Sequence, residues 1–84
     1  MATVVVNEGS VDLVEGASVQ AHFDIHDVQN GVLLVLVKCD ISQDQLVQLM
    51  AEKKDALGDA LADATNQDVN EVSWRDLDGH LHLL

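Results

Sequence analysis

The sequence has 84 residues, with 15 acidic and 4 basic side chains, and a formal net charge of −11 at pH 7. This balance argues against direct binding to nucleic acid or to anionic membranes, because both depend on lysine and arginine. Hydrophobic residues make up 48% of the chain, which is enough for a folded core. The single cysteine, Cys39, cannot form an internal disulfide.

Targeting signals are also missing from the sequence. The residues after Met1 carry no basic segment of the kind that begins a secretion signal. The longest apolar run, Val32–Val37, is six residues long, whereas a membrane span needs about twenty. We therefore expect a single domain, residues 1–84, located in the cytoplasm of the producing or host cell.

The N-terminal half predicts four strands. Short β-branched runs lie at 4–6 and 11–14, each closed by a glycine-containing turn. Apolar and polar residues then alternate over 19–26, as expected for a half-buried strand. Asn30-Gly31 is a strong hairpin signal, because both central residues of a type I′ turn need a positive φ. The following run, 32–37, lacks alternation, so we expect a central strand covered on both faces, or else one whose outer face is a docking surface.

One helix is predicted over about residues 43–65. Ser42 and Gln45 have the spacing of a capping box, and Asp44 complements the helix dipole in the first turn. Asn66 is the expected C-cap. The resulting prediction is an α+β fold: a small, largely antiparallel sheet of about five to six strands in the order ββββαββ, with one helix packed on one face.

The C-terminal residues predict a second hairpin, with a two-residue turn at Asp78-Gly79. This turn would pair Trp74 with Leu83 and Arg75 with His82. One face of the hairpin would then carry Trp74 together with Leu81 and Leu83. The other face would carry the histidines.

The acidic residues of the predicted helix form a pattern of their own. At 100° per residue they share one arc, opposite the leucines. We call these residues the acidic stripe: Asp44, Glu52, Asp55, Asp59 and Asp63. The last three repel one another at i,i+4 spacing, at about 0.2–0.5 kcal/mol for each pair. A helix selected only for stability would place lysine between them. We therefore interpret the stripe as a contact surface for a basic partner, with a merely solvated face as the alternative.

A second set of acidic residues lies on strands and loops: Asp24, Asp27, Asp40, Asp68 and Glu71. Carboxylates at i,i+4 spacing rise about 6 Å per step along a helix, whereas the phosphates of one DNA strand follow at about 3.4 Å. The helix alone therefore supplies about half the linear charge of a DNA strand. An imitation of a nucleic-acid backbone would need the second set to complete it.

The histidines give no strong metal signal. On a straight strand, His22 and His26 would be about 13 Å apart, too far to share an ion. His80 and His82 would need a third ligand from a neighbouring strand. The segment 76–79 resembles the opening of a calcium loop, but the bidentate glutamate of such a loop does not follow it. No nucleophile or phosphate-binding motif is present, so we expect no metal, no cofactor and no enzymatic activity.

These observations favour a non-enzymatic module that occupies a basic, nucleic-acid-binding surface of a host protein. In size, acidity and lack of catalytic groups the chain resembles the small inhibitor proteins of viruses and mobile elements, although no motif carries a residue over from them. A self-associating subunit, such as a virion component, is the structural alternative; its copies would pair as homodimers through residues 4–6 or the outer face of 32–37. A third interpretation is a halophile's protein, acidic for solubility in brine.

Overall fold

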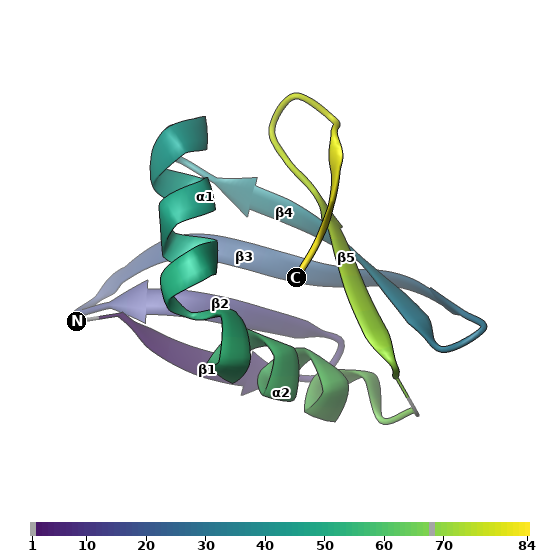
Figure 1. The fold of residues 1–84 in the computed structure, drawn as a ribbon. Helices are drawn as coiled ribbons and strands as arrows, with labels where there is room; N and C mark the ends of the chain where they lie inside the picture. Colours follow the sequence, from purple (N-terminus) through teal and green to yellow (C-terminus); the bar gives the residue numbers. More distant parts are fainter. Residues whose placement is uncertain (1, 68) are drawn as a thin grey trace.

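One sheet organises the molecule (Figure 1). The computed structural model describes residues 2–67 and 69–84, and within these ranges it contains six strands. They are β1 (Thr3–Asn7), β2 (Ser10–Glu15), β3 (Ser18–Gln29), β4 (Val32–Cys39), β5 (Glu71–Arg75) and β6 (Leu81–Leu83). Their order in the sheet is their order in the chain, and every neighbouring pair is antiparallel except β4 and β5. The predicted α+β fold with a largely antiparallel sheet is confirmed.

The turn between β3 and β4 follows the sequence prediction. Asn30 has φ 54° and Gly31 has φ 79°, the two positive values that a type I′ turn requires. Gln29 and Val32 face each other on either side of the turn. β3 also contains an irregularity between Ile25 and Asp27, where one residue is left out of the pairing.

The helical segment is two helices, not the single helix that we predicted. α1 (Gln43–Glu52) begins at the expected capping box, and α2 (Lys54–Thr65) ends at Asn66 in the left-handed conformation, as expected. They meet at Lys53, which has φ −106° and ψ 15°. Lys53 falls within the apolar arc, so a straight helix would point this side chain at the sheet. By turning there, the chain presents the apolar residues of each half separately.

Both helices cover the same face of the sheet (Figure 1). The core between the two layers includes Phe23, Leu33, Leu46, Leu57 and Leu61, each buried to 1% exposure or less. None of the helices in the described part of the chain is long and apolar enough to span a membrane.

No other element within residues 2–67 and 69–84 covers the opposite face of the sheet, which we call the open face. The prediction that β4 is covered on both faces is therefore wrong.

The C-terminal hairpin differs by one residue from its predicted register. Arg75 pairs with Leu81, and Trp74 pairs with His82. A longer loop causes the shift: the Asp76 N–H donates to the carbonyl of His80 at 2.9 Å. Because side chains alternate along a strand, a one-residue shift exchanges the two faces. His82 therefore stacks on Trp74 with ring centroids 4.6 Å apart, and Leu81 lies on the open face.

Candidate protein-binding surface

The acidic stripe lies on the outside of the helical layer. All five of its side chains are exposed. Asp44 and Glu52 belong to α1, and the other three belong to α2. Since the chain turns at Lys53, the stripe is two short segments and not one straight line. The longer segment is the one on α2, formed by Asp55, Asp59 and Asp63.

The stripe carboxylates have no cationic partner in the parts of the chain that the structure describes. Every ion pair found within residues 2–67 and 69–84 involves Asp12, Asp24 or Asp76 instead. Exposed and unpaired carboxylates keep their hydration and project negative potential into the solvent. The negative charge of this surface is therefore available to an incoming group.

A groove of about 640 Å³ runs beside α2. It combines acidic and apolar side chains from α2, β5 and the C-terminal residues with one basic side chain, Lys54. The residues that give it this character are Asp55, Asp59, Glu71, Val72, Leu83 and Leu84. Gly58 also lines it; a Cβ built there would lie 4.0 Å from Leu84 Cδ2. The groove thus offers apolar contact directly beside two residues of the stripe, which suits a basic segment that also carries an apolar side chain.

The structure separates the second set of acidic residues. Asp27, Asp40 and Glu71 are exposed, and of these only Glu71 lines the groove beside α2. Asp24 is half-buried and already paired within the sheet. Asp68 lies outside the described residues. Glu71 reaches the groove from the edge of β5, although its pairing with Val32 places it by register on the side of the sheet away from the helices.

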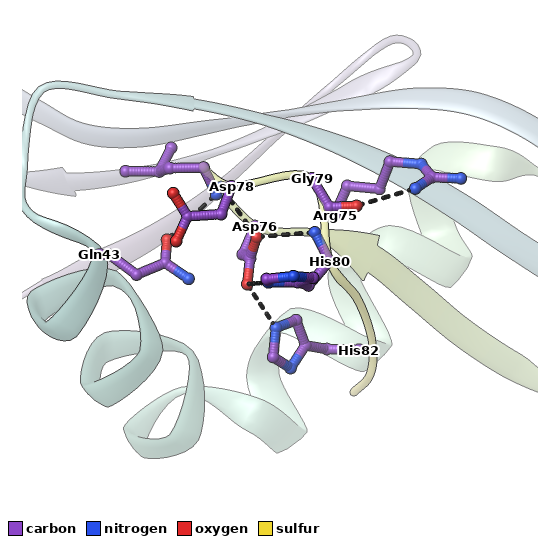
Figure 2. A network of polar contacts seen from close by, with 8 residues as sticks. Gln43, Arg75, Asp76, Asp78, Gly79, His80 and His82 are labelled. Atoms are coloured by element: carbon purple, nitrogen blue, oxygen red, sulfur yellow. Dashed lines mark hydrogen bonds and ion pairs between the residues drawn. The ribbon is translucent and has the colours of Figure 1, made fainter.

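The best-built polar cluster surrounds Asp76, at the start of the loop between β5 and β6 (Figure 2). Its Oδ1 accepts hydrogen bonds from the N–H groups of Asp78 and His80, both at 2.9 Å. Its Oδ2 accepts one from His82 Nε2 at 2.7 Å. The loop is also tied to α1, because the Leu77 N–H donates to Gln43 Oε1 at 3.0 Å. Asp76 is only 8% exposed.

These contacts explain the charge state and the role of Asp76. The hydrogen bond from His82 is the main factor that lowers the pKa of Asp76 to about 2, and the hydrogen bonds from the loop backbone add to its effect. A carboxylate held this way fixes the length of the loop and, through it, the strand register. Sequence analysis missed this role, although aspartate two residues before an Asp-Gly pair is a signal for local side-chain-to-backbone bonding.

The same cluster brings together three groups that can bind a metal ion. Asp76, Asp78 and His80 each place one ligand atom within 4.8 Å of the others. Both oxygens of Asp76 are already hydrogen-bonded within the loop. A cation would have to compete with these bonds, so we assign the cluster a structural role.

A second histidine cluster lies on the open face. His22 on β3 stands between Asp12 on β2 and Asp24 on its own strand. Nδ1 contacts Asp12, and Nε2 contacts Asp24 at 2.7 Å. Because ionised carboxylates only accept hydrogen bonds, both contacts can be hydrogen bonds at once when both ring nitrogens carry protons. The hydrogen bond to Asp12 accordingly raises the pKa of His22, against the opposing effect of partial burial.

Comparison with known proteins finds no matching family model, no matching curated protein and no matching solved structure.

Proposed function

We propose that this protein is a non-enzymatic binding module whose α2 surface engages a basic surface of another protein. The observation that carries the proposal is the row of Asp55, Asp59 and Asp63, exposed and without a cationic partner among the described residues. The row differs from three carboxylates that are paired within the fold. Asp12, Asp24 and Asp76 all have imidazole partners.

The neighbouring groove supports the same proposal. Asp55 and Asp59 belong both to the stripe and to the groove, where they adjoin Leu83 and Leu84. A basic partner could insert an apolar side chain there while its lysines or arginines approach the carboxylates. Charge attraction speeds association, and apolar burial lengthens the lifetime of a complex. Both contributions come from one contiguous surface.

A surface that normally binds nucleic acid is the partner class that fits best. Such surfaces carry the lysines and arginines that the stripe would neutralise. The three carboxylates on α2 rise about 6 Å per step, close to twice the phosphate spacing of one DNA strand. The stripe would therefore match alternate phosphate positions over about three residues, and not a continuous backbone.

The test is affinity capture with matched charge variants. The first bait is the chain with Asp55→Asn, Asp59→Asn and Asp63→Asn. The control bait carries Glu8→Gln, Asp40→Asn and Asp78→Asn, which removes the same number of exposed charges outside the helices. Extracts of the native host are passed over each bait at low salt, and bound proteins are quantified by mass spectrometry.

We expect the wild-type chain and the control bait to retain one or a few basic nucleic-acid-handling proteins that added salt releases. The α2 variant should bind them at least about tenfold more weakly, mainly through slower association. Equal loss from both variants would mean that total charge, and not the stripe, determines binding. Undiminished capture by the α2 variant would refute the proposal.

A further inference from the structure

The open face contains an apolar patch that the shifted register of the C-terminal hairpin completes. Leu36 pairs with Arg75, and Arg75 pairs with Leu81. Paired residues point to the same side of a sheet, so Leu36 of β4 and Leu81 of β6 share a face, with Arg75 of β5 between them. Its members, which we call the open-face patch, are Val32, Leu34, Leu36 and Leu81. Leu81 is 58% exposed, and the other three are half-buried.

A shallow depression of about 300 Å³ lies within this patch. Val32, Leu34 and Leu81 line it, together with Asp27 and Arg75. Gln29, Asn30 and Ser73 complete the lining, so the depression has a mixed surface with three apolar residues and one charge of each sign. Arg75 donates from Nη1 to the carbonyl of Gly79 at 3.0 Å, and it has no carboxylate partner in the described ranges 2–67 and 69–84.

The charges on the open face nearly balance, unlike those of the whole chain. Register places acidic and basic groups on this face: Asp12, Asp24, Asp27 and Glu71 against Lys38, Arg75 and His22. His22 adds a positive charge here when both of its ring nitrogens, which face carboxylates, are protonated. Two of the four basic side chains of the sequence lie here. This face is therefore the part of an acidic molecule on which a second acidic molecule meets the least repulsion.

From this arrangement we infer that the open face binds the open face of a second copy of this chain, giving a twofold symmetric homodimer. A twofold axis places the same patch on both partners, so Leu81 and its apolar neighbours bury one another. It also lets Arg75 of each copy approach the acidic groups of the other.

The available area is sufficient for a stable dimer. A standard interface takes about 800 Å² from each partner, roughly one sixth of the 5138 Å² surface of this chain. The molecule measures 33 × 25 × 18 Å along its principal axes, and one broad side of a two-layer molecule of this size can supply that area. Sheets packed face to face in this way form the core of many β-sandwiches.

The dimer would leave both acidic stripes exposed, because the helices cover the other side of the sheet. Its salt dependence should be opposite to that of binding to a basic partner. Two chains of −11 each repel at long range, and salt screens this repulsion. Added salt should therefore tighten the dimer, while it weakens capture of a basic protein. The inference does not rest on the function proposed above.

The test is sedimentation equilibrium of the full chain from about 10 to about 300 micromolar at low and high salt. We expect a transition from the 9.1 kDa monomer to twice that mass, at lower concentration when salt is high. Leu81→Gln should raise the dimer dissociation constant about tenfold, since it removes one large exposed apolar contact. Leu34→Gln combined with Leu81→Gln should raise it further.

The control variant is Val47→Gln. Val47 is 41% exposed on α1, so its replacement removes a similar apolar surface outside the open face. It should dimerise as wild type does. Leu81 is so exposed that its replacement should not affect folding, which circular dichroism verifies. A monomer at every concentration and salt level would overturn the inference. A dimer that Leu81→Gln leaves unchanged, or that Val47→Gln weakens equally, would place the interface elsewhere and would also overturn it.

Discussion

Asp76 and Asp59 are chemically identical side chains that the fold treats in opposite ways. Asp76 is 8% exposed and accepts three hydrogen bonds, one of them from a histidine side chain. Asp59 is exposed on α2 and has no cationic partner in the described part of the chain. The difference separates two uses of negative charge. Asp76 determines local structure, whereas Asp59 is available to another molecule.

The sharpest test of this comparison is to remove the charge from each residue in turn. Asp76→Asn replaces an acceptor with an amide whose NH₂ group must face a backbone N–H or His82. We expect the largest fall in melting temperature among single substitutions of the acidic residues, because hydrogen-bond donors in the loop lose their acceptor. Asp59→Asn removes the same charge and should leave the melting temperature almost unchanged. Thermal denaturation followed by circular dichroism measures both.

The pH dependence of stability in the acid range provides a second measurement for the same test. The pKa of Asp76 falls from 3.8 to about 2 on folding. Its contribution is therefore present above pH 4 and is lost as the pH falls toward 2. The difference in stability between wild type and Asp76→Asn should shrink over that range. If the two curves stay parallel, or if Asp59→Asn is equally destabilising, the distinction between the two carboxylates fails.

His22 provides a smaller effect with the opposite pH dependence. Its pKa is raised in the folded protein, chiefly by the hydrogen bond to Asp12. The stability that this histidine contributes is therefore fully present below its unfolded pKa of about 6.5 and is lost as the pH rises through the folded value. We expect His22→Gln to be less stable than wild type at pH 6 and to approach it as the pH rises.

His26→Gln is the matched control for this prediction. His26 is exposed on the same strand, and its replacement should leave the pH dependence of stability as in wild type. Urea denaturation at a series of pH values measures all three proteins. A difference between wild type and His22→Gln that does not change with pH would show that Asp12 and Asp24 do not favour the protonated form of His22 in the folded protein.

Much of the fold could be predicted because its signals are local. Ser42 and Gln45 begin α1 as their spacing requires, and Asn30-Gly31 makes the expected turn. The errors arise where a side chain acts at a distance. The turn at Lys53 depends on what its side chain would meet on the sheet. The register of β6 depends on hydrogen bonds to Asp76 and on the stacking of His82 against Trp74. These interactions override the apolar pattern of Leu81 and Leu83.

The candidate surface was predictable in part for the same reason. The helical period alone places Asp55, Asp59 and Asp63 on one exposed face. It does not reveal the groove, which forms only when the C-terminal residues pack beside Gly58. The helical period also does not reveal that Asp24 is paired with His22 on the same strand, unlike the exposed acids of α2. Pairing between side chains is a tertiary property, so sequence spacing ranks these acids equally.

The smallest expected effect concerns the stability of the α2 variant, and it addresses the remaining alternative for the acidity. Replacing Asp55, Asp59 and Asp63 with asparagine removes two like-charge i,i+4 pairs, which should recover at most about 1 kcal/mol, less what asparagine costs in helix propensity. At low salt we therefore expect the variant to be as stable as wild type or slightly more stable, and at high salt the two should converge because the repulsion is screened. A protein that is acidic for solubility in brine would behave differently: wild type would unfold at low salt, and the variant would need much less salt to fold. Urea midpoints across a salt series distinguish these outcomes. A wild-type chain that is stable at low salt would contradict the interpretation of a brine-adapted source, and a small gain from the substitutions would mean that the stripe costs the fold little.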